Sequence, residues 1–392
     1  MQCRGRMRKP WIAMAVVCTA LIIFGGCRGL SNQETNRSDE KPTKENAGIS
    51  VDLSIEDGEE VLLVSPVVKE FVESDIDVHS NARYTGFAEG KLDYAVPLNV
   101  SYYVEGMPED LSVSQAVLYI AEDETLADPQ AYIYEQRQSV LSVKFLKTNT
   151  VYYYKIEVTF SDGSTAVKTG SFHTANTPRI LSIDGIVNVR DIGGWATKQG
   201  TSIRQGMIYR GSELDGVVAA EYRLSPKGTR DMLDVLKIKT DMDLRSGENF
   251  NGTHALGADV KHIYYDSPCY GQIFEEHYKK SVQDIFADLA DGENYPIYLH
   301  CTYGNDRTGT ICYLLEALLG VSDEDLLKEY ELSLTYYGQR LSLESINGLA
   351  AQIQQYPGKS TQEKVENYLL SVGVTQETLQ SIRDILLSDG KA

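Results

Sequence analysis

Ten consecutive residues, His300 to Gly309 (HCTYGNDRTG), contain the side chains that could carry phosphate chemistry in this 392-residue chain. Five residues separate Cys301 from Arg307. An apolar, β-prone run, Tyr295 to Leu299, precedes the loop and a helical run, Thr310 to Leu319, follows it, so the predicted order is strand, tight loop and helix. A loop in this position can turn successive backbone N–H groups and the positive end of the helix towards a tetrahedral oxyanion.

The polar residues of the loop each have a predicted part in this chemistry. Arg307 would bind two phosphate oxygens at once, and the same field would stabilise the thiolate of Cys301 as a nucleophile. Gly304 would let the backbone turn where a side chain would block it. The Thr308 hydroxyl could hydrogen-bond the sulfur, and His300 could tie the loop to neighbouring backbone. The alternative interpretation is a buried structural cysteine beside a helix-capping aspartate and a surface arginine.

The loop resembles the active-site loop of the cysteine-dependent protein tyrosine phosphatases. It is most similar to their bacterial branch of atypical tyrosine and dual-specificity phosphatases, whose loop reads HCxxGKDRTG. Four further stretches match that branch: Asn188–Trp195 (NVRDIGGW), Ile203–Leu214 (IRQGMIYRGSEL), Asp243–Ser246 (DLRS) and Val321–Ser333 (VSDEDLLKEYELS). The resemblance extends from about Arg179 to the C-terminus. It implies a hydrolase that acts on phosphotyrosine, with phosphoserine and phosphothreonine as further candidates, through a phosphocysteine intermediate and without a cofactor.

The leaving oxygen of the substrate needs a proton, and the chain has no Trp-Pro-Asp tripeptide of the kind that many relatives use. The resemblance assigns the acid role to Asp306, although an aspartate at a helix start is also an ordinary N-cap. Asp243 and Asp266 are the reserve candidates, and Asp243 could instead form a structural ion pair with Arg245. The resemblance implies that Asn188, Arg190, Asp191 and Arg210 brace the loop or lend positive charge to the pocket; the alternative is helix-start and turn chemistry only. Residues expected to bind substrate are Thr302, Tyr303, Gly304, Asn305, Asp243, Arg245 and Arg210.

One loop position departs from the family pattern, because Asn305 stands where the family has a lysine that is associated with phosphoinositide binding. Phosphoinositides and inositol phosphates, the alternative substrates, would need several basic residues around the site, and the formal net charge of −19 argues against them. The same charge excludes nucleic acid as a partner. The six histidines have no metal-ligand spacing, so no metal is expected. The alternative from another class is a surface binding protein with a vestigial phosphatase domain.

The N-terminus resembles a lipoprotein signal. Basic residues precede an apolar run of about fourteen residues, Trp11 to Phe24, which is too short to span a bilayer comfortably. Small residues then precede Cys27, the predicted lipidation site. An uncleaved N-terminal anchor is the alternative, and it also puts the bulk of the chain outside the cytoplasm. We expect a signal peptide over 1–26, a polar tether over 27–50 and a membrane-anchored lipoprotein on the cell surface or the periplasmic face.

Residues 51–177 predict an all-β sandwich, used as a spacer or a binding module, because short β-rich runs follow one another without a helical pattern. The runs are Glu60–Val68, Ala95–Val104, Ser114–Ile120, Val140–Leu146, Val151–Phe160 and Thr165–His173. A turn over Ser161–Ser164 joins the last two as a hairpin, and this tract resembles the closing strands of a fibronectin type III-like module. We expect Tyr152 and Tyr154 to face the core.

Residues 178–392 predict an α/β catalytic domain with a parallel sheet flanked by helices. Its expected strands are Met207–Tyr209, Ile238–Leu244, Val260–Tyr265 and Ile297–His300. Gln272–Ala290 has the spacing of an amphipathic helix, Ser322 with Asp325 predicts a capping box after a stop at Gly320, and the last helix should begin near Thr375. Outside the loop, Cys312 is predicted to pack in the core, and Cys269 is a candidate resolving thiol for Cys301.

Overall fold

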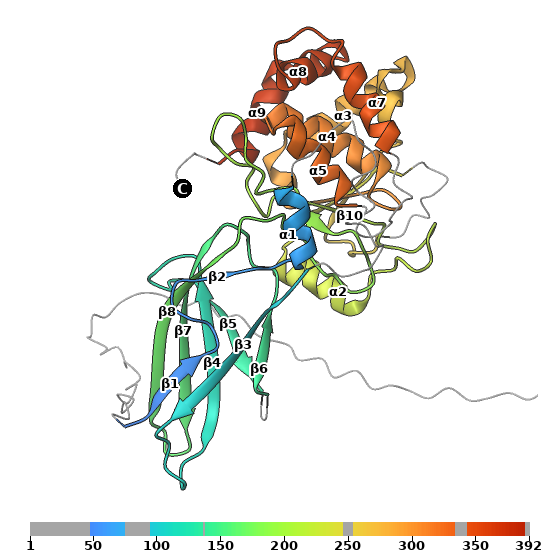
Figure 1. Cartoon of the computed structure of the whole chain (residues 1–392). Helices are drawn as coiled ribbons and strands as arrows, with labels where there is room; N and C mark the ends of the chain where they lie inside the picture. Colours follow the sequence, from blue (N-terminus) through green and yellow to red (C-terminus); the bar gives the residue numbers. More distant parts are fainter. Residues whose placement is uncertain (1–47, 75–94, 136–137, 246–253, 334–342, 389–392) are drawn as a thin grey trace, which may run out of the picture. The chain divides into compact units, whose positions relative to one another are not determined.

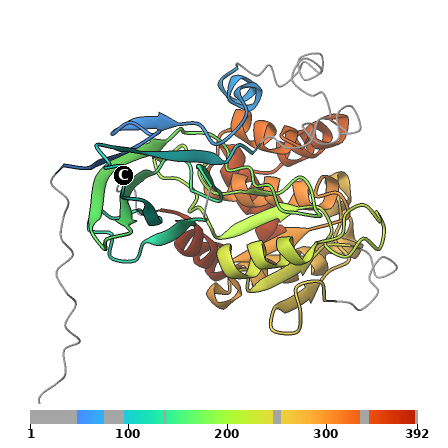
Figure 2. The ribbon, with the colours of Figure 1, turned by 90° about the horizontal axis from the view of Figure 1, so that it is seen from below.

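The structure is a computed structural model that describes residues 48–74, 95–135, 138–245, 254–333 and 343–388. The expected signal peptide, the lipidation site Cys27 and nearly all of the tether lie outside these residues. The described residues all belong to one compact unit. In Figures 1 and 2 the strands of its first half (blue to green) form one group, and the helices of its second half (orange to red) form another. Within the described ranges, no helix has the length and apolar character needed to cross a membrane.

The first half of the compact unit contains two sheets. One has the order β2-β8-β7-β4-β5 (Glu59–Val61, Thr165–Thr174, Val151–Phe160, Val113–Ala121, Gln130–Tyr134), and the other has the order β1-β3-β6 (Ser50–Leu53, Leu98–Glu105, Val140–Val143). Alternate side chains of β7 enter one shared apolar core. Tyr152 and Tyr154 are among them, as predicted. The β7–β8 hairpin turns with Gly163 at a φ of 81°, which confirms the predicted turn.

A helix interrupts these strands, so the prediction of a strand over Glu60–Val68 is wrong beyond Val61. Helix α1 covers Pro66–Glu73 and follows Ser65, whose backbone is extended. Proline has no N–H to lose at a helix start, its φ suits the helix, and it keeps the preceding residue extended. The dipeptide Ser65-Pro66 was therefore a helix-start signal inside an apolar run. The short strands β1 and β5 were also not predicted.

The second half of the unit contains a five-stranded central sheet. Its order is β12-β11-β13-β10-β9 (Lys261–Tyr264, Thr240–Asp243, Ile297–His300, Ile208–Gly211, Arg190–Asp191). Strands β10 to β13 are parallel, as predicted, and each lies within two residues of its expected bounds. The edge strand β9 was not predicted and is antiparallel to β10. Tyr298 packs on one side of β13, and Ile297 and Leu299 pack on the other, so both faces of the sheet are covered.

Helices flank this sheet, with α2 on one side and the later helices on the other (Figure 1). They are α2 (Pro226–Arg230, continued by the π-turn Asp231–Val235), α3 (Lys279–Leu289), α4 (Asp306–Leu319), α5 (Asp323–Glu331), α7 (Leu343–Ile353), α8 (Thr361–Ser371) and α9 (Gln376–Leu386). The side chain of Ser322 accepts from Asp325 N, Gly320 ends α4 with a φ of 93°, and Thr375 caps α9, as predicted.

The helix predicted over Gln272–Ala290 is shorter in the structure. Only its second half is α-helical, and 3₁₀ turns occupy Tyr270–Phe274, Glu276–Tyr278 and, after α3, Gly292–Asn294. The backbone of Glu275 is extended and breaks the helical pattern. Tertiary contacts hold this segment instead, since the Tyr368 hydroxyl donates to the carbonyl oxygen of Ile273 at 2.8 Å.

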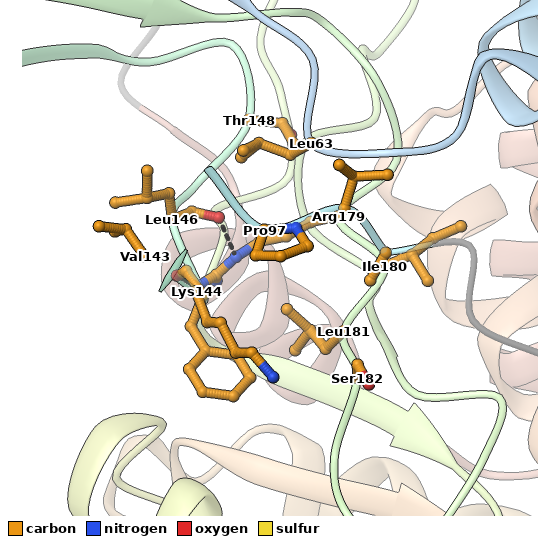
Figure 3. A pocket seen from close by; sticks show the side chains of 13 residues that line it. Leu63, Pro97, Val143, Lys144, Leu146, Thr148, Arg179, Ile180, Leu181 and Ser182 are labelled. Atoms are coloured by element: carbon orange, nitrogen blue, oxygen red, sulfur yellow. Dashed lines mark hydrogen bonds between the residues drawn. The ribbon is translucent and has the colours of Figure 1, made fainter. Parts of the chain in front are cut away.

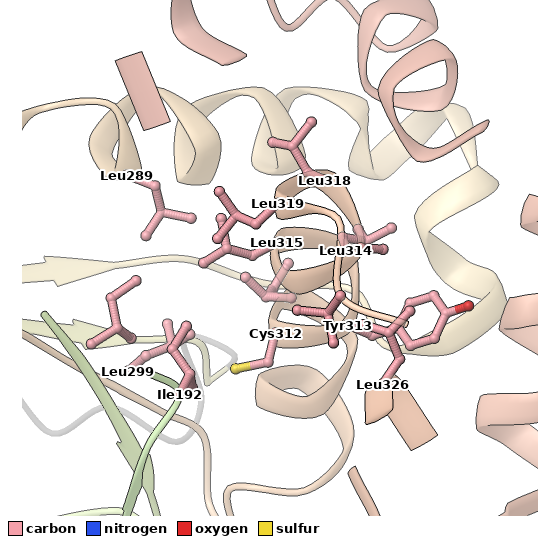
Figure 4. Packing of buried hydrophobic residues seen from close by; sticks show 14 of the residues in the cluster. Ile192, Leu289, Leu299, Cys312, Tyr313, Leu314, Leu315, Leu318, Leu319 and Leu326 are labelled. Atoms are coloured by element: carbon pink, nitrogen blue, oxygen red, sulfur yellow. The ribbon is translucent and has the colours of Figure 1, made fainter. Parts of the chain in front are cut away.

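Helix α4, which follows the cysteine loop, is almost completely buried (Figure 4). Leu314, Leu315 and Leu318 have no exposed surface. The Cys312 thiol also packs in this core, as predicted, and burial raises its pKa. A helix held on all sides fixes the position of its own N-terminus, where the loop ends.

The two halves of the unit share contacts. Val68 and Phe71 of α1 belong to the same apolar core as α4. Arg179 donates from Nε to the carbonyl oxygen of Leu146 at 3.0 Å and from Nη1 to Asp191 Oδ2 at 2.8 Å. Figure 3 shows Arg179 in the wall of a mostly apolar cavity of about 160 Å³ at this junction. None of the residues that line the cavity belongs to the loop His300–Gly309.

Candidate active site

The cysteine loop begins at the carboxyl end of the central strand. In the registers of the parallel strands, His300 of β13 lies opposite Gly211 of β10 and opposite Asp243 of β11. Three strands therefore end together, at the edge where open α/β sheets bind their ligands. Cys301 follows directly and is only 2% exposed.

Gly304 lets the loop turn close to the neighbouring strand end. Its φ is 70°, and a Cβ atom added to it would lie 2.4 Å from the carbonyl oxygen of Gly211. Because that obstacle is backbone, no side-chain movement could make room for it. The loop is also tied to the segment after β10, since Glu213 N donates to the carbonyl oxygen of Thr302 at 3.0 Å. The turn therefore requires glycine at position 304 for two reasons, the positive φ and the lack of room for a side chain.

The backbone of the loop offers several N–H groups that its own fold does not use. Among the described residues, the N–H groups of Thr302, Gly304, Asn305, Asp306 and Arg307 have no acceptor, whereas Gly309 N already bonds back into the helix. Backbone N–H groups in folded proteins are rarely left without an acceptor, which water or a ligand supplies where the protein does not. A run of such groups at a helix start is a binding site for a tetrahedral anion.

Arg307 supplies the positive charge at this site. Burial raises the pKa of the Cys301 thiol, but the charge of Arg307 and the neighbouring polar groups of Thr308 lower it by more, so the net pKa lies below that of an ordinary cysteine. Arg307 Nη2 lies 3.4 Å from Thr302 Oγ1. In the described part of the chain, no carboxylate lies within 4 Å of its guanidinium. Its charge remains available to an anion beside the thiolate.

Asp306 does not cap its own helix. It is the first residue of α4, and its carboxylate accepts a hydrogen bond from the Tyr270 hydroxyl at 2.5 Å and from no backbone N–H of the described residues. The residue at the N-cap position is Asn305, which is buried and whose Oδ1 accepts from Asn188 Nδ2 at 3.1 Å. The capping interpretation of Asp306 therefore has no hydrogen bond to support it.

His300 anchors the start of the loop. Its Nδ1 lies 3.0 Å from the carbonyl oxygen of Cys301, and its Nε2 forms a 2.9 Å ion pair with Asp241. Burial lowers the pKa of the imidazole, but Asp243 and Asp241 outweigh this and raise it to about 9. His300 is buried and both of its ring nitrogens are engaged, so it acts on the chemistry by positioning the loop, in agreement with its expected part in tying the loop to neighbouring backbone.

Two buried arginines, Arg210 and Arg190, support the loop through hydrogen bonds. Arg210 donates from Nη2 to the carbonyl oxygen of Gly304 at 2.7 Å and from Nη1 to Glu329 at 2.5 Å. Arg190 donates to the other oxygen of Glu329 at 2.7 Å and to Asn188 Oδ1 at 2.7 Å. Arg210 has no exposed surface, and its hydrogen bonds to Gly304 and Glu329 favour a bracing role over the expected contact with substrate. The bracing role predicted for Asn188, Arg190 and Arg210 agrees with these contacts.

Arg245 likewise supports the loop and does not face a substrate. The expectation that Asp243 and Arg245 bind substrate is corrected, because the two residues bond each other in a buried cluster. The Arg245 guanidinium bonds Asp243 Oδ2 at 2.7 Å, Glu213 at 2.7 Å and Asp215 at 2.8 Å. It is 2% exposed, and three carboxylates occupy its donors. This is the structural ion pair that the sequence left open, enlarged by two acidic residues.

Three other predicted residues, Asp191, Asp266 and Cys269, are not part of the cysteine loop itself. Asp191 holds a turn by accepting from Gly193 N at 2.8 Å. Asp266 follows β12 and is exposed. Cys269 is half-buried, its sulfur lies 3.2 Å from Gln272 Oε1, and burial and the charge of Asp306 raise its pKa. No cluster of His, Cys, Asp or Glu that could hold a metal ion is found in the described ranges.

Sequence reasoning missed Tyr270, Glu213 and Glu329. Glu329 and Glu213 lie in stretches that matched the family, so their position was a signal, but their pairing with arginines was not visible. Nothing in the sequence singled out Tyr270, which follows β12 and contacts a helix start 36 residues later.

Comparison with known proteins adds to this geometry. Residues 181–388, just over half of the chain, match the tyrosine phosphatase family. A Cupriavidus necator protein provisionally named a tyrosine-protein phosphatase is 29% identical over 170 residues, which cover 38% of this chain and 61% of the relative. The chain thus spans less than two thirds of that relative's length. A Nostoc commune tyrosine-protein phosphatase is 23% identical over 207 residues, covering 39% of this chain and 68% of the relative.

Two solved structures also align with part of the chain. The core catalytic domain of the S. cerevisiae PP-IP phosphatase SIW14, in complex with citrate, has a TM-score of 0.27 and 15% identity, and covers 48% of this chain and 88% of that one. A second structure, of the Siw14 catalytic core, has a TM-score of 0.28 and 15% identity, and covers 49% of this chain and 96% of that one.

Proposed function

Because the chain belongs to the tyrosine phosphatase family, we propose that it hydrolyses phosphotyrosine, with phosphoserine and phosphothreonine as further substrates, through a phosphocysteine at Cys301. The observation that carries the proposal is the pairing of this buried, low-pKa thiol with a row of unused backbone N–H groups and with Arg307. A thiolate beside an anion site is the arrangement that nucleophilic phosphoryl transfer needs.

The first step transfers the phosphoryl group to sulfur. The Cys301 thiolate attacks phosphorus in line with the ester oxygen, so a P–S bond forms and the P–O bond to the leaving group breaks. The loop N–H groups and Arg307 bind the three remaining phosphate oxygens as charge spreads over them. Asp306 gives its proton to the departing tyrosine oxygen, which leaves as a neutral phenol.

The second step returns the enzyme to its starting state. A water molecule attacks the phosphocysteine, and Asp306, now a carboxylate, takes one of its protons. The P–S bond breaks, the electron pair returns to Cys301 as thiolate, and inorganic phosphate leaves. One carboxyl group thus serves as acid and then as base.

Asn305 supports a protein substrate over a phosphoinositide or an inositol phosphate. Its side chain is neutral and buried and accepts from Asn188, so it adds no charge at the position where the family pattern has lysine. Polyanionic substrates call for several cations around the site. Three buried arginines of the central sheet and its strand ends, Arg190, Arg210 and Arg245, are instead neutralised by buried carboxylates.

The test is phosphate release from three substrates assayed side by side: a phosphotyrosine peptide, a phosphothreonine peptide and a phosphoinositide. Release should be fastest from phosphotyrosine and should vanish in Cys301→Ser, while Cys269→Ser, which removes a half-buried thiol outside the loop, keeps activity. Preference for the phosphoinositide would move the assignment to lipid or inositol phosphates. A folded chain that releases nothing would point to a binding protein with a vestigial catalytic domain.

The acid role of Asp306 has its own test. Asp306→Asn should slow hydrolysis of phenyl phosphate by at least about a hundredfold and that of p-nitrophenyl phosphate far less, because p-nitrophenolate leaves without a proton. Equal losses on both substrates would reject the role and would bring Asp266 forward.

We propose further that strands β1 to β8 form a fibronectin type III-like module and that Cys27 carries a lipid that anchors the chain to an extracytoplasmic membrane face. The two sheets around one apolar core support the first part, and the sequence pattern around Cys27 supports the second. Mass spectrometry of the purified full chain should find an acylated N-terminal cysteine. A Cys27→Ser variant should carry no acyl group, and a wild-type chain whose Cys27 is unmodified would contradict the anchor.

A further inference from the structure

Tyr270 is held in an unusual position beside the cysteine loop. Its φ is 50°, in the left-handed region where bulky side chains are rare. Its backbone N–H donates to the Thr310 hydroxyl on α4 at 2.8 Å. Strained residues of this kind persist only where their surroundings hold them, and they concentrate at functional sites. The strain here presents the phenol to Asp306.

The hydrogen bonds of this phenol have one direction. The Tyr270 hydroxyl is 2.5 Å from Asp306 Oδ1 and 2.5 Å from the Tyr330 hydroxyl. While Asp306 is a carboxylate it can only accept, so Tyr270 gives it its single proton, and Tyr330 must then donate to Tyr270. The chain Tyr330 to Tyr270 to Asp306 leads from the buried core to the carboxyl group.

The contact occupies only one carboxylate oxygen. Oδ1 bonds Tyr270, and Oδ2 has no partner among the described residues. Asp306 is also the first residue of a buried helix, which fixes its backbone but not its side chain. The hydrogen bond from the Tyr270 hydroxyl to Oδ1 adds a second attachment, and it therefore sets the direction in which Oδ2 points.

We propose that Tyr270 is a positioning residue that holds the Asp306 carboxyl group so that Oδ2 meets the leaving oxygen of the substrate. The proposal rests on the phosphatase function proposed above. Tyr270 itself touches no reacting atom, and no bond to it forms or breaks. Removing its hydroxyl should leave binding and sulfur attack intact and should impair proton transfer alone, since small displacements of a catalytic group cost large factors in rate.

The experiment measures how the rate depends on the leaving group. In the full chain, Tyr270→Phe should lower kcat for phenyl phosphate about tenfold and kcat for p-nitrophenyl phosphate less than threefold, with KM unchanged. In an Asp306→Asn background the same substitution should cost nothing more, because two residues that act as one unit are not additive. Tyr330→Phe, which keeps the bond to Asp306 but removes the donor behind it, should show a smaller effect of the same kind.

Tyr368→Phe is the matched control. It removes another buried phenol that bonds the same 3₁₀ segment, at Ile273, without contact to Asp306. A role of Tyr270 in packing alone would lower both substrates equally and would add to the loss in Asp306→Asn, and either result overturns the proposal. A wild-type chain without Cys301-dependent turnover would instead overturn the proposed function, and the two failures are therefore distinct.

Discussion

Replacing Glu329 by glutamine tests the support beneath the cysteine loop. The carboxylate lies between two guanidiniums, 2.7 Å from Arg190 Nε and 2.5 Å from Arg210 Nη1, and it is buried with both of them. Burial raises the pKa of Glu329, but the two arginines lower it by more, so it is ionised. Glu329→Gln would leave two buried cations without a counterion, and removing one partner of a buried pair costs about 3–5 kcal/mol.

A second buried acid can offset part of this loss. Glu316 is completely buried on α4, and neither of its carboxyl oxygens has a hydrogen-bond partner among the described residues. Burial and the charge of Glu329 raise its pKa well above the ordinary value, which favours its neutral form in the folded protein. In Glu329→Gln the repelling charge is gone and the two arginines remain, so Glu316 should ionise at lower pH than in the wild type and return a negative charge to the network.

The ionisation of Glu316 changes how the free energy of unfolding depends on pH, and the direction of that change can be predicted. A buried acid with a raised pKa reduces the free energy of unfolding by up to about 1.4 kcal/mol per pH unit above its unfolded pKa, until pH reaches its folded pKa. Because Glu329→Gln should lower the folded pKa of Glu316, the variant should lose less stability than the wild type as pH rises. The deficit of about 3–5 kcal/mol should thus be largest at low pH and shrink as pH rises.

Urea denaturation followed by far-UV circular dichroism at pH 5, 6, 7 and 8 measures this deficit. The same series in a Glu316→Gln background is the control, because a deficit there should not change with pH. A Glu329→Gln variant within 1 kcal/mol of the wild type at pH 5 would refute the bracing role. Identical pH slopes in the two backgrounds would refute the compensation by Glu316.

Three further predictions follow from single positions. Gly304→Ala should lower kcat/KM at least about a hundredfold, because its Cβ would lie 2.4 Å from the Gly211 oxygen. The control is Gly200→Ala, also at positive φ but with open space around it, which should cost only about 1 kcal/mol of stability and no activity. Wild-type turnover in Gly304→Ala would contradict this. His300, with its pKa raised to about 9, stabilises the fold fully below pH 6.5 and loses up to about 3 kcal/mol as pH rises through 9. Denaturation of His300→Asn should lack this component, and an unchanged slope would count against it. Phe71→Ala should lower the free energy of unfolding by about 3–5 kcal/mol and lower the temperature at which activity is lost, since Phe71 belongs to the core of α4; inactivation at the wild-type temperature would argue that the two halves are independent.

The sequence carried most of the information about the central sheet and the loop. The bounds of β13 were predicted to the residue, because a buried apolar run ends in a motif with a definite order. Signals of this kind are local. The helix α1 was not predicted because its Ser-Pro start signal lies inside an apolar run that resembles a strand. The 3₁₀ turns before α3 were not predicted because tertiary hydrogen bonds override the helical pattern there.

Pairings between distant residues were beyond local reasoning. The sequence favoured Arg210 and Arg245 as cations for a substrate, but Glu329 and Glu213 neutralise them from 119 and 32 residues away. In the sequence, an arginine that faces the ligand cannot be told apart from one that faces a buried carboxylate. Only the fold shows which of the two it faces.

The shared core of α1 and α4 affects how the chain is made. The apolar face of α1, with Val68 and Phe71, leaves the ribosome early, while the core that buries it extends to Leu386. At 5–20 residues per second, the roughly 300 intervening residues take about 15–60 s to synthesise. During that time the apolar face of α1 lacks the partner surface that buries it in the folded chain.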